Sequence, residues 1–465
     1  LDRQDVEVMK DRIKNGANLL EDHVFQFDFL NDDFEKLPKP LYEIINNPEK
    51  RKKLVIYINP PYAEATTAKT VTGTGENKSG VAIDNKVNEY YKAKIGNASN
   101  EIFALFMSAI IDKLPDSILA QFSTLKFIQG TNFVKFKNYF LAKYMGGFIV
   151  PADTFDNVKG SFPIGFTIWK LSIKEKINII NCDVYDRKAM LLGEKVFYGE
   201  LPQSINKWIK LSDNKVNKGI GFMCNPSPDF QHNSQLYVSI KKGIEHFNFW
   251  NIVVNNLSCG SIYFAVRHCI EATWLNDRDQ FLYPNDNWKD DKEFQNDCLA
   301  FTLFHSQNRI SSQEGTNHWI PFTEQEVNAR EKFESNFMTD FIKGKIKAEG
   351  DDNLFAISET KEKDDGPLTF SPEAIAVFDA GRELWRYYHA TINSSFSSMR
   401  AGVGSVNASL YDIREYFQGR NEKGKMNNKS DDEIYMQLIG DLREKLKQLA
   451  RKIEPKVYEY GFLKE

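Results

Sequence analysis

The stretch Leu54–Tyr62 constrains the fold more than any other part of the chain. Its first five residues, Leu-Val-Ile-Tyr-Ile, form an apolar run that is too short for a helix and typical of a buried strand in a parallel sheet. Asn59-Pro60-Pro61-Tyr62 then ends the strand, because two prolines fix two φ angles and remove two backbone donors. Open α/β sheets do their chemistry at such carboxyl ends of strands. The sequence therefore predicts an α/β domain with a site at this turn.

The residues of this turn suit the binding of an exocyclic amine. The side-chain carbonyl of Asn59 and the backbone carbonyl of Pro60 can both accept hydrogen bonds from one amine, which keeps the nitrogen lone pair aimed at an incoming methyl group. Tyr62 offers a flat face on which a base taken out of a duplex can stack. The alternative is purely structural, a strand ended by prolines and followed by an exposed tyrosine.

The turn resembles the Asn/Asp/Ser-Pro-Pro-Tyr/Phe motif of the amino-methylating DNA methyltransferases. Its Asn-Pro-Pro-Tyr form is similar to the adenine-specific branch of restriction-modification systems, in particular type IIG enzymes and type I modification subunits. The resemblance implies a Rossmann-like sheet, S-adenosylmethionine as cofactor, double-stranded DNA as partner and no metal. It also implies that Asn59, Pro60, Pro61 and Tyr62 are the catalytic residues.

A second segment matches the same family. His23–Leu30 alternates in polarity and predicts a short strand that ends in an acid. The family has a strand ending in Asp-Phe-Leu one β-α unit before the Asn-Pro-Pro-Tyr strand, and here Phe34–Ile45 is the expected connecting helix. The resemblance implies that Asp28 accepts a hydrogen bond from the adenine amine of the cofactor and that Phe29 packs on that ring. A surface aspartate in a turn is the alternative.

The glycine-rich cofactor loop of the family is expected before Leu1, so we interpret the chain as a fragment that lacks its beginning. Asp2 either binds the ribose hydroxyls of the cofactor, as the next family element implies, or caps an amphipathic helix predicted within residues 3–20. Gly73-Thr74-Gly75 and Gly402-Val403-Gly404 are poor candidates for the loop, because no apolar strand precedes either of them.

Residues 63–99 are polar and predict an irregular loop, which either closes over a flipped base or is a disordered insertion. A helix is expected from Asn100 to Leu114. Lysines alternate with aromatic residues between Lys126 and Phe140. This segment is either a phosphate-contacting face or an amphipathic element with solvated lysines, and the second interpretation is slightly favoured.

Two further strands are expected at Gly146–Pro151 and Phe166–Leu171, and both resemble strands of the family. In the family, an aromatic residue before the second strand contacts the flipped base from the side opposite the tyrosine. Phe162 is our candidate for this stacking role, with Phe155 as the second choice and ordinary core packing as the alternative.

The regular alternation of strands and helices fades after about residue 176. We therefore assign 1–176 to the catalytic domain, 177–350 to a mixed α+β target-recognition region, 351–367 to a linker or exposed loop, and 368–465 to a helical C-terminal region. Short strand-like runs within the target-recognition region are Ile177–Ile180, Gly219–Met223, Leu236–Ile240, Ile252–Asn255 and Ser261–Val266. Four of its residues are polar enough to read bases or phosphates, although nothing in the sequence distinguishes them from ordinary surface residues: Arg267, His268, Arg278 and Asp279. The helices expected near the end of the chain are Pro372–Ile392, Leu410–Phe417 and Asp431–Ile453.

The composition fits a cytoplasmic globular protein and leaves its partners open. No apolar run approaches the length of a membrane span, and the five cysteines form no Cys-x-x-Cys pair, which favours free thiols. The net charge of −4 does not point to nucleic acid, although a basic cleft on an acidic body can still collect phosphates.

The function predicted from the sequence is site-specific N6-methylation of a flipped adenine in DNA, within a restriction-modification or defence system. A specificity or nuclease subunit or segment is a further possible partner. The alternatives are a DNA-binding specificity module that is catalytically incomplete, and an amine methyltransferase that acts on RNA or protein.

Overall fold

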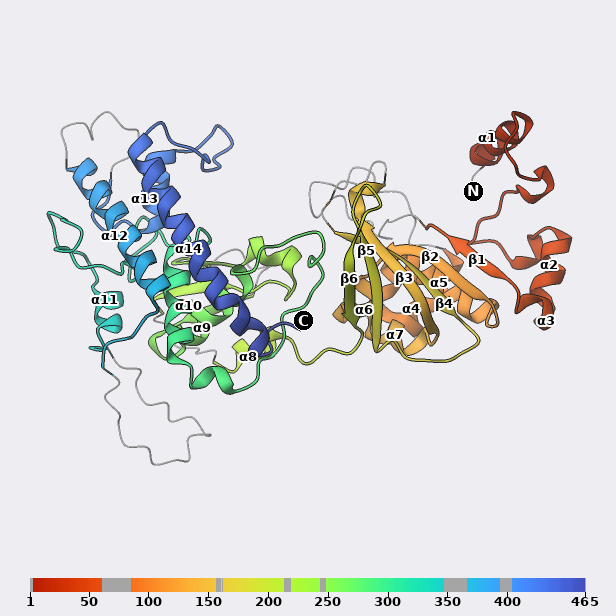
Figure 1. Ribbon diagram of the computed structural model, residues 1–465, viewed down its shortest axis with the longest axis horizontal. Helices are drawn as coiled ribbons and strands as arrows, with labels where there is room; N and C mark the ends of the chain where they lie inside the picture. The colour runs from red at the N-terminus through yellow and green to blue at the C-terminus, as the bar shows by residue number, and fades with distance from the viewer. Residues whose placement is uncertain are drawn as a thin grey trace, which may run out of the picture. The chain divides into compact units, whose positions relative to one another are not determined.

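The computed structural model describes residues 3–60, 85–155, 160, 162–212, 219–242, 248–346, 366–393 and 404–464 (Figure 1). The chain divides into two compact units. The first comprises Leu1–Leu201 with Thr273–Arg278, and the second comprises Pro202–Ala272 with Asp279–Glu465. The first unit thus continues beyond residue 176, while the domain boundaries expected at 176, 350 and 367 remain predictions.

A six-stranded mixed sheet forms the centre of the first unit. Its strands run in the order β1-β2-β4-β3-β5-β6, with β1 parallel to β2, β3 parallel to β5, and the remaining neighbours antiparallel. The strands expected at 54–58, 146–151 and 166–171 are confirmed. The unit belongs to the α/β class. The bounds are β1 (Val55–Ile58), β2 (Ile118–Thr124), β3 (Lys143–Pro151), β4 (Pro163–Lys170), β5 (Ile179–Tyr185) and β6 (Leu191–Tyr198).

Helices cover one face of this sheet and bury it in an apolar core (Figure 1). They are α4 (Lys86–Ile95), α5 (Ile102–Lys113), α6 (Lys126–Gln129) and α7 (Val134–Tyr139), with 3-10 helices at Gly96–Asn100 and Thr131–Phe133. The side chain of Asn85 caps α4 by accepting from the backbone N–H of Asn88 at 2.7 Å. The helix expected from Asn100 to Leu114 is confirmed as α5. Residues 86–99, which were expected to be irregular, form α4 and part of a 3-10 helix, so that part of the prediction is wrong.

The N-terminal part differs from the sequence prediction in one strand. Helix α1 (Arg3–Lys14) is present as expected, and a 3-10 helix covers Glu21–His23. Val24–Asp28 follows without ladder partners in any described strand, so the strand expected at His23–Leu30 is wrong. Alternating polarity permits a strand, but a strand also needs a neighbour with a free edge.

The helix expected at Phe34–Ile45 is divided by proline. A 3-10 helix covers Phe34–Lys36, Pro38 then occupies the N-cap position, and α2 runs over Lys39–Asn46. A short helix α3 (Pro48–Arg51) precedes β1. The side chain of Asn47 caps α3 by accepting from the backbone N–H groups of Glu49 and Lys50.

The second unit has its own apolar core, built from helices and a three-stranded antiparallel sheet in the order β8-β7-β9. The run Ser261–Val266 lies within helix α9, so its prediction as a strand is wrong, because a short apolar run suits either structure when it is buried. The three C-terminal helices are confirmed. The elements are α8 (Ile205–Lys210), β7 (Gly221–Cys224), β8 (Tyr237–Ser239), β9 (Phe249–Ile252), α9 (Leu257–His268), α10 (Lys292–Phe304), α11 (Phe337–Ile342), α12 (Pro372–Ile392), α13 (Leu410–Gln418) and α14 (Glu433–Glu459), with 3-10 helices at Phe230–Gln235, Val254–Asn256 and Asn287–Lys289.

The long helix α14 packs against α10 and α12. Its side chains Leu442, Leu449 and Ile453 recur at helical spacing and are buried, whereas Ile434 in the first turn is exposed. None of the helices described here is long and apolar enough to cross a lipid bilayer.

Candidate functional site at the carboxyl edge of the first sheet

Four strands of the first unit end at one edge of the sheet. Strands β1, β2, β3 and β5 run in the same direction, whereas β4 and β6 run opposite to them. The edge therefore carries the carboxyl ends of four strands, the start of β4 and the turn between β5 and β6. Ligands of α/β sheets bind at edges of this kind. We refer to it below as the carboxyl edge.

Asn59 and Pro60 lie at this edge, directly after β1. Asn59 is exposed and Pro60 is buried, so the polar side chain is accessible while the ring is fixed by its surroundings. Pro61, Tyr62 and the rest of 61–84 lie outside the described residues. The structure thus places the first half of the Asn-Pro-Pro-Tyr turn where the sequence predicts it.

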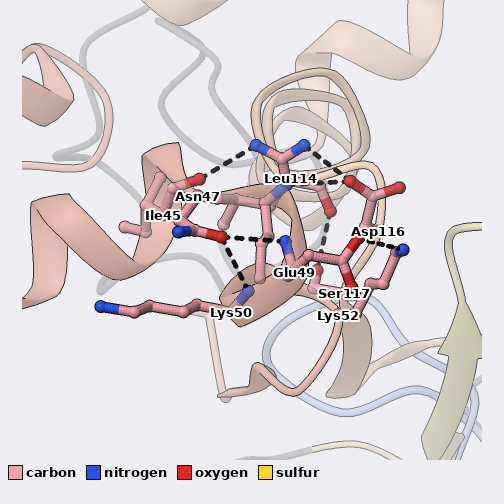
Figure 2. Close-up of polar contacts among 9 residues, drawn as sticks. Ile45, Asn47, Glu49, Lys50, Lys52, Leu114, Asp116 and Ser117 are labelled. Carbon is pink, nitrogen blue, oxygen red and sulfur yellow. Dashed lines mark hydrogen bonds and ion pairs between the residues drawn. The ribbon is translucent and has the colours of Figure 1, made fainter.

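The start of β1 is anchored by a polar cluster around Arg51 (Figure 2). The guanidinium donates to Asp116 Oδ2 from Nε at 3.2 Å and from Nη2 at 2.6 Å, and its Nη1 donates to the carbonyl of Ile45 at 2.9 Å. Both charged side chains are largely shielded from solvent. Because Asp116 lies two residues before β2, this contact holds the first residues of β1 against its parallel neighbour.

The expected cofactor residues lie in a turn that packs on the helices. The carboxylate of Asp28 accepts from the backbone N–H of Leu30 at 3.0 Å and from the side chain of Asn31 at 2.9 Å. Asp28 is exposed, and each carboxylate oxygen retains a further lone pair. The carbonyl of Leu30 accepts from the backbone N–H of Val87 at the start of α4. Asp28 can therefore still accept from an amine, although it begins a turn rather than ends a strand.

Phe29 points into the helical layer. Its ring stacks on Phe106 of α5 with the centroids 4.4 Å apart and the planes at 10°, and Phe34 lies edge-on to it. One face of the Phe29 ring is thus occupied by Phe106, and Phe27 also lies edge-on to it with the centroids 6.5 Å apart. Asp2 is outside the described part of the chain.

The two aromatic candidates for base stacking both lie at the carboxyl edge. Phe162 directly precedes β4, is half-buried, and has the guanidinium of Arg278 5.9 Å from its ring centroid. Phe155 follows β3 and contacts Phe122 of β2 with the centroids 5.4 Å apart. Both rings are half-buried, and the stacking role of either stays a prediction.

Sequence reasoning missed a polar side chain beneath the edge. Gln121 of β2 pairs with Ile58 of β1 and is fully buried. Neither atom of its amide has a hydrogen-bond partner within the described part of the chain, and the same holds for the hydroxyl of Ser123 two residues later. Buried polar atoms are nearly always satisfied, so this pair marks unused hydrogen-bonding capacity in β2 beside the end of β1. The only sequence signal is a glutamine inside an apolar strand.

A shallow hollow of about 330 Å³ lies farther along the carboxyl edge. Pro151 and Trp274 give it apolar walls, and the remaining lining residues are charged. Arg187 forms an ion pair with Asp153 across it. The lining residues are Pro151, Asp153, Asp186, Arg187, Lys188 and Trp274.

The lysine-rich segment after β2 serves packing. Phe127, Phe133, Phe136 and Phe140 are buried in the core of the first unit. Lys137 donates to the carbonyls of Ile128 and Gly199, and its burial lowers the pKa of its ammonium group below the usual value. The amphipathic interpretation of residues 126–140 agrees with these contacts.

Arg267, one of the expected base-reading residues, is structural instead. It is completely buried and donates to the side chains of Asn233 and Tyr263 and to the carbonyls of Ser227 and Asp229. His268, which follows it, contacts the carbonyls of Phe264 and Asn233 through its ring nitrogens. The network stabilises the second unit by satisfying a buried charge.

Among the residues that the structure describes, no group of three or more His, Cys, Asp or Glu side chains could hold a metal ion. No protein-family model matches the chain, and no curated protein matches it significantly. The functional argument therefore rests on the carboxyl edge itself.

Proposed function

We propose that the chain transfers a methyl group from S-adenosylmethionine to the exocyclic amine of an adenine flipped out of double-stranded DNA. The observation that carries the proposal is the position of Asn59-Pro60, which directly follow a strand at the carboxyl edge of a sheet of the α/β class. This is where such sheets bind substrates, and the turn has the acceptors that an amine needs.

Asn59 and Pro60 have defined roles in this reaction. The Asn59 side-chain carbonyl and the Pro60 carbonyl accept the two N–H groups of the adenine amine, so that its lone pair faces the methyl donor. The new N–C bond forms as the S–C bond of the donor breaks, and one amine proton leaves to solvent. Alignment of this kind can contribute several kcal/mol of the barrier. Because Pro60 is buried, its carbonyl is held in place before the base arrives.

The base would be held between aromatic side chains. Tyr62 stacks on one face in the proposal, and Phe162 closes the other. Phe162 directly precedes β4, two strands away from β1 in the sheet, which corresponds to about 10 Å between the backbones at about 4.8 Å per strand. Side chains from both positions can span this distance around a base.

The cofactor supplies the activated methyl group when it is bound. Asp28 fits the adenine end of such a ligand, because its carboxylate is exposed and has lone pairs to spare. Phe29 can contribute the edge of its ring beside Phe106. Asp2 and a glycine-rich loop would complete the cofactor site in the proposal.

We assign sequence recognition to the second unit, in keeping with a cytoplasmic restriction-modification or defence enzyme that works with a nuclease or specificity subunit or segment. The second unit has a core of its own, which suits a recognition domain that follows a catalytic one.

A DNA-binding specificity module without catalysis is the second candidate. The observation that favours it is the absence of a described strand at His23–Leu30, where the expected cofactor half should pair with the sheet. Methyl transfer distinguishes the two candidates.

The test is transfer of tritium from labelled S-adenosylmethionine into plasmid DNA by the longest natural form of the protein, followed by base analysis. We expect label in adenine and a loss of about a hundredfold for Asn59→Ala, the usual cost of removing one preorganised polar group. Asn178→Ala is a matched control, because Asn178 is an exposed asparagine next to the amino end of β5. Tight DNA binding by the wild-type protein without any label would overturn catalysis and support the specificity module.

A further inference from the structure

The turn between β5 and β6 is closed tightly. The backbone N–H of Asp186 donates to the carbonyl of Met190 at 3.0 Å, and that of Ala189 donates to the carbonyl of Asp186 at 3.1 Å. The Asp186 carboxylate accepts from the N–H groups of Lys188 and Met190, both at 2.8 Å. Ala189 has a φ of +59°, as expected for the last residue of a three-residue hairpin loop. The turn therefore presents its side chains in a fixed arrangement.

These side chains combine positive charge with exposed apolar surface. Arg187 is 67% exposed at its side chain, and Lys188 is exposed and has no ion-pair partner within the described residues. Met190, Leu191 and Leu192 follow directly, with relative exposures of 62%, 60% and 60%. Three successive large apolar residues in solvent are unusual in a folded protein and indicate a contact surface.

The position of the turn indicates what this surface contacts. It lies at the carboxyl edge, beside the hollow walled by Pro151 and Trp274, and in Figure 1 it stands at the upper end of the β5 and β6 strands. Four strand spacings separate β5 from β1, which is about 19 Å at about 4.8 Å each. A duplex lying along the edge advances about 3.4 Å per base pair, so the turn would meet it about six base pairs from an adenine at Asn59.

We infer that the β5–β6 turn enters a groove of the DNA duplex whose flipped adenine is held at Asn59, an inference that rests on the proposed function. Lys188 and Arg187 contact phosphates on the groove walls, and Met190, Leu191 and Leu192 lie against the sugars and base edges. A duplex offers both kinds of partner at once, because its phosphates are anionic and its groove surface is partly apolar. Arg187 exchanges its ion pair with Asp153 for a phosphate, whereas Lys188 has no ion-pair partner within the described residues. A protein partner would be matched by the apolar residues but gives no reason for this exposed lysine.

The salt dependence of DNA binding tests this inference. The full chain is titrated with a labelled duplex of about thirty base pairs, and binding is followed by fluorescence anisotropy over a range of potassium chloride concentrations. Each phosphate contact contributes about 0.9 to the slope of log K against log salt concentration. We expect Arg187→Ala/Lys188→Ala to reduce the slope by about 1.8, and Met190→Ser/Leu191→Ser to weaken binding at every salt concentration with the slope unchanged.

The matched control is Lys143→Ala/Lys170→Ala. These two exposed lysines pair across β3 and β4 at the opposite edge of the sheet, so the variant removes the same charge without touching the carboxyl edge. A slope reduced equally by both double variants would indicate general attraction and overturn the inference. Unchanged DNA binding by both turn variants would overturn it as well and would point to a protein partner.

Methyl transfer is measured in parallel to separate this inference from the proposed function. If the wild-type protein methylates DNA while the turn variants bind normally, the turn inference fails and the proposed function stands. If the turn variants lose DNA binding but the wild-type protein transfers no methyl group, the proposed function fails and the groove contact stands. A wild-type protein that binds no duplex would overturn both.

Discussion

Arg51 offers the sharpest test of how the fold positions the candidate site. Its guanidinium makes two hydrogen bonds to Asp116 and one to the carbonyl of Ile45 (Figure 2), and only 16% of its side chain is exposed. Hydrogen bonds to charged groups contribute about 1.5–3 kcal/mol each, and they are not additive when they share a donor group. Breaking a shielded ion pair costs about 3–5 kcal/mol. Because Arg51 and Asp116 retain some access to water, we expect Arg51→Ala to destabilise the first unit by about 3 kcal/mol.

The effect should be local to β1. The carbonyl of Arg51 accepts from the N–H of Leu54, and the carbonyl of Leu54 accepts from the N–H of Ile118, so the pair lies directly before the parallel ladder. Hydrogen–deuterium exchange of a peptide that covers residues 54–60 reports on this ladder without interference from the second unit. A loss of about 3 kcal/mol corresponds to about hundredfold faster exchange, at about 1.36 kcal/mol per factor of ten.

Lys52→Ala is the control for Arg51→Ala. Lys52 neighbours Arg51 but forms only an exposed ion pair with Glu49, and such pairs contribute little to stability. Arg51→Lys retains the charge and loses the two-pronged geometry, so its exchange rate should lie between those of the wild type and Arg51→Ala. Exchange in Arg51→Ala no faster than in Lys52→Ala would refute the idea that this cluster holds β1 in place.

Two further predictions concern buried polar groups. Gln121→Met replaces an amide that has no partner in the described structure with an apolar side chain of similar shape. The free energy of unfolding, measured in urea, should therefore rise by about 1–3 kcal/mol, while methyl transfer falls. A stabilised and fully active variant would show that Gln121 has no role at the site. His389 of α12 is fully buried and its ring nitrogens lack partners in the described residues, so burial lowers its pKa to about 4. His389 binds a proton near pH 6.5 in the unfolded state but only near pH 4 in the folded state. Its contribution to the free energy of unfolding is therefore fully present above pH 6.5 and declines by about 3 kcal/mol as the pH falls to 4. Urea denaturation of the second unit between pH 7.5 and 4 should show this decline, and His389→Met should reduce it; an equal decline in both proteins would assign it to other groups.

Elements whose signals lie within a few residues of one another could be predicted from the order of residues alone. The apolar run before Asn59 is a strand that stops at proline, because proline removes the donors on which a ladder depends. The helix Pro372–Ile392 begins at the cap provided by Ser371 and keeps its apolar stripe buried, and both properties are visible in the order of residues.

Strand pairing and side-chain burial could be read only from the folded chain. Val24–Asp28 has the alternation of a strand but no described neighbour, and Ser261–Val266 is apolar enough for a strand but is buried within a helix. The unsatisfied amide of Gln121 and the exposed turn after Tyr185 are likewise consequences of strand order, because a ladder joins residues far apart in the chain. Pairing and burial depend on these distant partners, which the local pattern of residues does not predict.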